Sequence, residues 1–147
     1  MRILVHGSGL VREDLVDFEA ALALYGNDID DEHTPWEANL GWIVKMKKGE
    51  FIGRDALAKQ KETGVVRRLA GFEVTGRGIA RHGYAVQLGG ESGIVTSGTQ
   101  TPTVGKAIGL AYVPTGRVTP GTPLAIDVRG RSVAAHVVPT PFYKRKS

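Results

Sequence analysis

The sequence has no cysteine among its 147 residues. This absence excludes disulfides, thiolate metal sites and a cysteine nucleophile, and it favours a reducing compartment such as the cytoplasm. Long apolar runs are missing as well, since the longest fall far short of the ~20 consecutive residues that a membrane-spanning helix needs. We therefore expect a cytoplasmic protein that does not span a membrane.

Histidine is scarce, and the sequence predicts no metal ligands and no catalytic residue. The four histidines, His6, His33, His82 and His136, are too scattered for the spacing of a metal site or a catalytic triad. The acidic stretch from Asp28 to His33 lacks the glycine and the distal glutamate of a calcium-binding loop. Its carboxylates are better explained as solvated turn residues that cap neighbouring helices.

Acidic residues are also unevenly distributed. Residues 1–65 contain 8 Lys and Arg against 12 Asp and Glu, a net charge of −4, whereas residues 66–147 contain 11 against 3, a net charge of +8. Such a split indicates two regions that face different surroundings. The basic region would suit nucleic acid, a polyanionic ligand or an acidic neighbour.

The first 65 residues have a helical pattern. Apolar residues at three- and four-residue steps predict a helix over residues 13–24, closed by Gly26. Thr34-Pro35-Trp36-Glu37 has the form of a capping box and predicts a short second helix. Residues 54–63 predict a third helix, which ends at Gly64.

Beyond residue 65 the pattern changes to short β-rich runs separated by turns. Fourteen of the 20 glycines lie between Gly64 and Gly130, and six of the seven prolines lie after residue 100. Strands with no helix between them must pair mainly antiparallel, because parallel strands need long crossovers. Six such strands indicate an antiparallel barrel or a sandwich. Of the two we predict the barrel: an α+β fold with a helical segment over residues 1–65 and a six-stranded antiparallel β-barrel over residues 66–147. The six runs are residues 67–74, 84–88, 93–97, 107–113, 124–128 and 133–138.

Two glycine-rich stretches resemble nucleotide-binding loops only weakly. Residues 2–9 look like a first strand and glycine turn, but Arg12 stands where a third glycine is needed. Residues 76–83 include Arg77 and Arg81 and could form a phosphate-binding loop. No helix follows to supply its N-terminal dipole, so a hairpin tip is the favoured interpretation.

Read together, the middle and the end of the chain resemble the C-terminal part of the glycine cleavage T-protein family. The matching blocks keep the family order and spacing from about residue 18 to the end of the sequence. They are FEAALALYGNDI at 18–29, TPWEANLGW at 34–42, KGEFIGRDAL at 48–57, GIVTSGT at 93–99, IGLAYVP at 108–114 and PFYK at 141–144.

The resemblance implies a folate-dependent aminomethyltransferase. Members of the family take an aminomethyl group from the lipoyl arm of the H-protein and pass its carbon to tetrahydrofolate, with release of ammonia. By resemblance, Trp42 lines the folate pocket, where an indole can stack on the pterin. Arg12 takes the place of a family arginine that contacts folate, although one extra residue separates it from the following match. Tyr143 and Arg145 belong to a family ending that reaches back to the folate.

The resemblance also implies that an essential part lies outside this sequence. Family chains are more than twice as long, and their catalytic aspartate lies in an N-terminal part with no counterpart here. We expect the chain to be inactive alone and to depend on that N-terminal half, in the same or a separate chain. The alternative is a small basic barrel that binds single-stranded nucleic acid. It is disfavoured because few aromatic residues lie among the basic ones.

Overall fold

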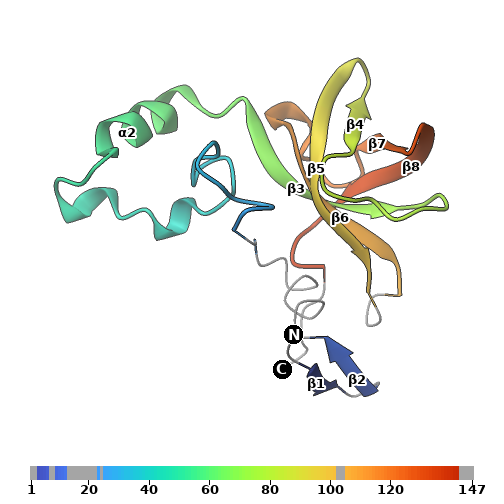
Figure 1. The fold of residues 1–147 in the computed structure, drawn as a ribbon. Coiled ribbons are helices and arrows are strands. Elements are labelled where there is room, and N and C mark those ends of the chain that lie inside the picture. The colour runs from blue at the N-terminus through green and yellow to red at the C-terminus, as the bar shows by residue number, and fades with distance from the viewer. Residues whose placement is uncertain (1–2, 7–8, 13–22, 24, 102–104, 143–147) are drawn as a thin grey trace.

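The computed structural model describes residues 3–6, 9–12, 23, 25–101 and 105–142 (Figure 1). At the N-terminus, β1 (Ile3–His6) pairs antiparallel with β2 (Gly9–Arg12) in a two-stranded sheet. The described residues of the weak dinucleotide-binding pattern, Ile3–His6 and Gly9, therefore lie in a strand pair. The helix predicted over residues 13–24 lies almost wholly outside the described residues.

Residues 25–63 consist mainly of turns and short helices. Two 3₁₀ helices, η1 (Gly41–Ile43) and η2 (Met46–Lys48), precede the helix α2 (Arg54–Thr63). Gly64 ends α2 as predicted: it has a φ of 82°, and its N–H donates to the Gln60 carbonyl at 2.9 Å.

The capping box at Thr34 forms, but the helix predicted to follow it does not. Residues 35–39 form turns. Asn39 has a φ of 59°, which no helix tolerates, and the chain then passes beneath the Trp36 ring. At Gly41 a Cβ atom would lie 2.4 Å from that ring, so only glycine fits this close approach. The backbone therefore turns sharply where a regular helix would continue.

Six strands then close into the predicted antiparallel barrel, which confirms the α+β fold (Figure 1). Their order around the barrel is β3-β6-β5-β4-β7-β8, with β8 pairing back to β3. The strands are β3 (Arg67–Val74), β4 (Ala85–Leu88), β5 (Glu91–Gln100), β6 (Ala107–Pro114), β7 (Pro123–Val128) and β8 (Arg131–Val138).

Alternating apolar side chains fill the barrel interior. Phe72 on β3 is 1% exposed and lies opposite Gly109 on β6, where a Cβ atom would be 2.2 Å from the phenyl ring. The ring thus occupies the space that the glycine leaves. Other interior residues include Val86, Leu88, Val95, Val113, Leu124, Ile126 and Val137.

Strand β6 is buried on both of its faces. While Ala111 and Val113 point into the barrel, Ile108, Leu110 and Tyr112 form a second apolar cluster with Leu69. Phe142 packs against this outer cluster. The barrel therefore has an apolar outer face, against which the helical segment can pack.

The connection from β3 to β4 differs from the predicted hairpin tip. These strands are not neighbours, since β3 pairs with β6 and β8 while β4 pairs with β5 and β7. The hairpin interpretation of residues 76–83 was therefore wrong. The connection crosses the barrel: Gly76 lies against Val133 on β8, and Ala80 lies against Gly98 on β5.

Candidate functional site

A pocket of about 250 Å³ lies where the segment around Trp42 meets the outer cluster of the barrel. Residues from the helical segment, from two barrel strands and from the chain after β8 contribute to it. The pocket is therefore built where distant parts of the chain meet, which is typical of binding sites. Its lining residues are Ala23, Ala38, Asn39, Leu40, Trp42, Leu69, Gly71, Leu110, Thr140 and Pro141.

The Trp42 side chain lines the pocket and is largely open to solvent. It lies on η1, and 74% of its surface is exposed. The other tryptophan, Trp36, is fixed: its Nε1 donates to the Leu57 carbonyl at 2.9 Å, and Lys61 lies 5.8 Å from its ring centre. Trp36 thus ties the segment to α2, whereas the indole of Trp42 remains available for stacking on a flat ligand.

Backbone and amide hydrogen bonds hold this segment on β3. The Leu69 N–H donates to the Glu37 carbonyl at 2.8 Å, and the Asn39 side-chain amide donates to the Leu69 carbonyl at 2.6 Å. Both polar groups of the Leu69 backbone are thereby satisfied from the helical segment. Because Asn39 lies three residues before Trp42, these bonds also fix the start of η1.

Glu37 connects the capping box to the barrel. One carboxylate oxygen accepts hydrogen bonds from the Thr34 N–H at 2.8 Å and the Thr34 hydroxyl at 3.1 Å, and the other accepts from Arg67 Nε at 3.0 Å. Burial acts to raise the pKa of Glu37, but the bonds from Thr34 and Arg67 outweigh it and the pKa is lowered. Glu37 is therefore held as a carboxylate.

Asp28 forms a second connection, at a bulge in β5. The register of β5 against β6 shifts between Val95 and Ser97, so that Thr96 is the extra residue. The hydroxyls of Thr96 and Ser97 both donate to Asp28 Oδ1, and Asp28 is fully buried. The Tyr112 hydroxyl donates to the Asp28 carbonyl at 2.8 Å. The bulge thus turns two hydroxyls toward one buried carboxylate.

A ring stack covers the same face of the barrel. His33 stacks on Tyr112 with ring centres 4.0 Å apart, and its Nδ1 lies 2.6 Å from Asp30 Oδ1. The hydrogen bond from His33 lowers the pKa of Asp30, and burial raises the pKa of Tyr112. Tyr112 thus stays a neutral hydrogen-bond donor to the Asp28 carbonyl.

Gly71 makes room for the chain that returns after β8. A Cβ atom at Gly71 would lie 2.5 Å from Thr140 Cγ2 and 3.0 Å from the Phe142 ring. Gly71 and Thr140 both line the pocket, so a side chain at residue 71 would push against its wall. The glycine therefore allows the C-terminal segment to reach the side of Trp42.

The structure places the predicted folate-contacting residues unequally. Trp42 lines the pocket, and Pro141, two residues before Tyr143, lines it too. Tyr143 and Arg145 themselves lie outside the described residues, and of Arg12 only its place in β2 is described. The supporting roles of Asn39 and Gly71 were not predicted, because their partners lie 30 or more residues away along the chain.

The described residues lack a cluster of metal ligands and a membrane-spanning helix. They contain no group of three or more histidine, aspartate or glutamate side chains that could hold a metal ion. Among these same residues, no helix is long and apolar enough to cross a membrane.

Comparison with known proteins identifies the family. Residues 67–144 match the model of the glycine cleavage T-protein C-terminal barrel domain. The chain is 55% identical over 138 residues to an aminomethyltransferase of Rippkaea orientalis, covering 92% of this chain and 37% of the relative. It is 51% identical over 143 residues to an aminomethyltransferase of Rubrobacter xylanophilus, covering 95% of this chain and 37% of the relative.

The fold has a counterpart among solved structures. The crystal structure of glycine cleavage system aminomethyltransferase T from Bartonella henselae matches with a TM-score of 0.82 and 32% identity, over 88% of this chain and 37% of that one. The chain thus spans little more than a third of the length of these relatives. It belongs to the glycine cleavage T-protein family, and its barrel is the C-terminal barrel domain of that family.

Proposed function

We propose that the chain is the C-terminal, folate-binding part of a tetrahydrofolate-dependent aminomethyltransferase of the glycine cleavage system. The observation that carries the proposal is the exposed indole of Trp42 above a pocket, in a chain whose relatives are aminomethyltransferases. A pteridine ring is flat and polar at its edge, so it suits an indole face beside the Asn39 and Thr140 side chains. Bound tetrahydrofolate would accept the transferred carbon.

The size of the pocket supports a partial site. Its volume of about 250 Å³ lies below the roughly 300–1,000 Å³ typical of pockets that enclose a small molecule. It offers room for a ring system but few walls for the rest of a folate. We infer that the remaining walls, and the catalytic aspartate implied by the resemblance, belong to the part of the relatives outside the matched third.

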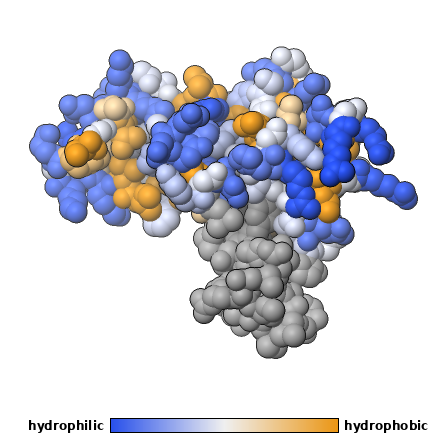
Figure 2. All heavy atoms as spheres, in the orientation of Figure 1, coloured by the Kyte–Doolittle hydropathy of each residue, from blue (hydrophilic) through white to orange (hydrophobic). Residues whose placement is uncertain are grey.

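Exposed apolar side chains on the segment that carries Trp42 suggest where that part docks. On the helical segment Ile52 is fully exposed, and Ile43 and Phe51 are partly exposed like Trp42. Figure 2 shows apolar surface on this segment, which projects to the left of the barrel. Apolar surface of this kind marks interaction sites. We propose that the N-terminal part of the enzyme covers it, and that the lipoyl-bearing H-protein meets the completed enzyme.

The first test is enzymatic. The chain alone should release no ammonia from aminomethylated H-protein with tetrahydrofolate, because the resemblance places the catalytic aspartate in the N-terminal part of the family chains. Addition of the N-terminal part of an aminomethyltransferase should restore turnover. Turnover by the chain alone at the rate of a full-length relative would refute the dependence.

The second test addresses the folate site itself. Folate titration followed by NMR should show weak binding, in the high micromolar range or weaker, since an open pocket buries little of the ligand. Trp42→Ala should abolish it, whereas the matched variant Trp36→Phe should retain it. Binding that survives Trp42→Ala would show that the indole is not the stacking surface.

Three narrower predictions accompany the proposal. Tyr143, Arg145 and Arg12 should contribute to folate binding, the two arginines mainly at low salt, where charge screening is least. The boundary between the helical segment and the barrel should lie near residue 65. A cytoplasmic location, expected from the absence of cysteine, also remains a prediction.

A further inference from the structure

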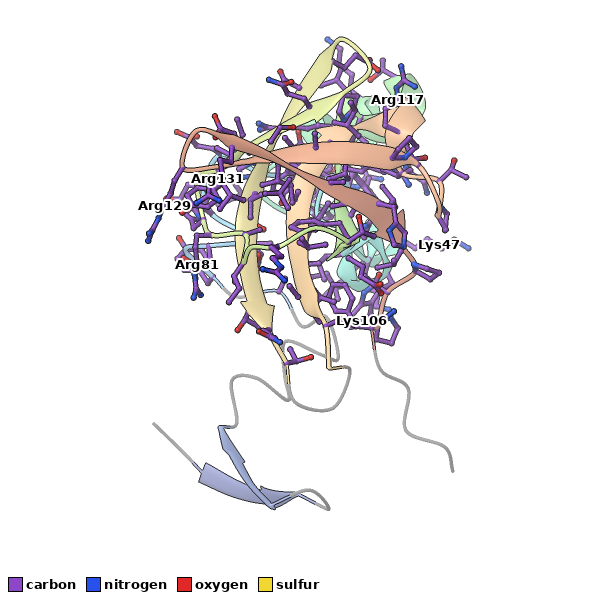
Figure 3. All side chains as sticks on the ribbon, turned by 90° about the vertical axis from the view of Figure 1, so that its right-hand side faces the viewer. Lys47, Arg81, Lys106, Arg117, Arg129 and Arg131 are labelled. Atoms are coloured by element: carbon purple, nitrogen blue, oxygen red, sulfur yellow. The ribbon has the colours of Figure 1, made fainter. Side chains whose placement is uncertain are left out.

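A second and larger pocket, of about 370 Å³, lies elsewhere on the barrel. Among the described residues, its lining includes four arginines and no acidic residue, and none of these residues lines the Trp42 pocket. In Figure 3, Arg81, Arg129 and Arg131 lie on one edge of the barrel, away from Lys106 and Arg117. We call this the arginine pocket, and its lining residues are Arg77, Gly78, Ile79, Arg81, Tyr84, Val128, Arg129, Arg131 and Val133.

Two connections that are distant in sequence bring these arginines together. Arg77 and Arg81 lie on the crossing between β3 and β4, whereas Arg129 and Arg131 lie at the turn between β7 and β8. Val133 fixes the relation between the two connections, because it packs against both Gly76 and Gly78. The pocket is therefore a product of the barrel topology.

Arg129 occupies a backbone position that does not suit an arginine. Val128 pairs with Arg131, so Arg129 and Gly130 form a two-residue hairpin loop with φ values of 53° and 82°. Such turns prefer asparagine or glycine at the first position. An arginine held there is locally strained, and strain of this kind gathers at ligand-binding sites. The strained position of Arg129 therefore points to a role for its guanidinium group in binding a ligand.

The ion pairs of the barrel involve other basic residues than the arginines of the pocket. Lys106 pairs with Glu73 at 2.7 Å, Arg117 with Glu91 at 2.6 Å, and Arg67 with Glu37 at 3.0 Å. No carboxylate among the described residues pairs with any of the four arginines of the pocket. Arg68, which lies outside the pocket, also has no carboxylate partner among the described residues.

Local contacts hold the site ready without neutralising it. Arg81 Nη1 donates to the Gly98 carbonyl at 3.3 Å, which ties it to β5. The nearby Asp127 accepts a hydrogen bond from the Gly130 N–H at 2.7 Å, which stabilises the turn between β7 and β8. Several guanidinium groups around one concavity create a strong positive potential, which an anion would relieve.

We propose that the arginine pocket binds a small polyanion that has two or more phosphate or carboxylate groups. Guanidinium groups bind both kinds of anion in a forked, two-bond geometry, so four arginines suit a ligand with several such groups. The volume lies in the range of small-molecule sites. This binding goes beyond the proposed folate function and does not depend on it.

Single-stranded nucleic acid fits the pocket less well. Such ligands are bound along grooves where successive bases stack on several aromatic side chains. Tyr84 is the one aromatic side chain among the described residues of this lining. The arginines surround a single concavity, which suits a compact ligand.

Calorimetry of the whole 147-residue chain tests the proposal. Tripolyphosphate and citrate serve as probes, with inorganic phosphate as the weaker, single-group reference. We expect saturable binding at low salt, tighter for a polyanion than for phosphate. A preference between tripolyphosphate and citrate then distinguishes phosphate from carboxylate ligands.

Variants separate the pocket from general basicity. Arg129→Gly removes the guanidinium and suits the turn, so the fold should be kept while affinity falls about tenfold, the lower end for a bond to a charged group. Arg131→Gln should weaken binding similarly. Arg117→Gln is the matched control on the same barrel, and Trp42→Ala should leave the affinity unchanged.

NMR provides a readout that loss of stability would not imitate. The amide signals of Gly78 and Gly130 should shift on addition of tripolyphosphate. Equal effects of Arg129→Gly and Arg117→Gln, or an absence of saturable binding, would overturn the proposal. So would a preference for oligothymidine whose affinity grows with strand length.

Discussion

Replacement of Glu37 by glutamine tests how the helical segment that carries Trp42 is joined to the barrel. The side chain of Glu37 is almost fully buried, and its two oxygens accept hydrogen bonds from Thr34 and Arg67. A carboxamide keeps the shape but has only one acceptor oxygen. In either orientation its NH₂ group faces a donor, the Thr34 N–H or Arg67 Nε, so one of the two connections is lost.

The size of the expected destabilisation depends on how exposed the hydrogen-bond partners of Glu37 are. Breaking a fully buried ion pair costs about 3–5 kcal/mol, and hydrogen bonds to charged groups contribute about 1.5–3 kcal/mol. The Arg67 side chain is 41% exposed, so water compensates part of its loss. We expect Glu37→Gln to lower the free energy of unfolding by about 2 kcal/mol at neutral pH.

The effect should depend on pH in a defined direction. The folded pKa of Glu37 lies below its value of about 4.3 in the unfolded chain. The unfolded state therefore binds the proton more readily, and the contribution to stability is complete above the unfolded pKa. It is lost as the pH falls through the folded pKa, so wild type and variant should converge in acid.

Urea unfolding at neutral and acidic pH measures both effects. Glu50→Gln is a suitable control, because Glu50 is exposed and makes no described hydrogen bond or ion pair. If Glu37→Gln stays within about 0.5 kcal/mol of the control at neutral pH, the carboxylate does not hold the segment. A difference that persists unchanged in acid would refute the link to its ionisation.

Two further predictions concern the barrel. Gly109→Ala should lower the free energy of unfolding by about 2–3 kcal/mol, because the new methyl group would overlap the Phe72 ring and the Ser97 carbonyl. The melting temperature should fall by ~5–10 °C. Phe72→Leu in the same chain should recover part of the loss, and full additivity of the two substitutions would argue against this clash. Limited proteolysis should cut first near the exposed Gly64 and leave the barrel as the more resistant fragment, and earlier loss of the barrel would contradict the proposed boundary near residue 65.

The barrel was predictable because its signals are local. Each strand is a short β-rich run between turn residues, and the predicted range of residues 67–74 coincides with β3. Strand order was not predictable, since the pairing of β3 with β6 and the closure by β8 join residues far apart in sequence. The hairpin expected between β3 and β4 failed for this reason.

The site was predictable only in its local parts. The spacing of Thr34 and Glu37 predicted the capping box, and the hydrogen bonds form. Nothing in that spacing indicates that Glu37 also binds Arg67, 30 residues later. The same holds for Asp28, whose burial depends on a bulge at Thr96 that no sequence pattern announced.

The arginine pocket shows why a motif can fail while its chemistry remains. The phosphate-binding interpretation of residues 76–83 was disfavoured because no helix N-terminus follows, and β4 indeed follows instead. A helix N-terminus is one way of making an anion site, with backbone N–H groups and a dipole. The structure offers another, since the closed barrel adds Arg129 and Arg131 to Arg77 and Arg81. Basic residues that come together from separate loops have no fixed spacing in the sequence. The arginine pocket could therefore be recognised only from the topology of the barrel.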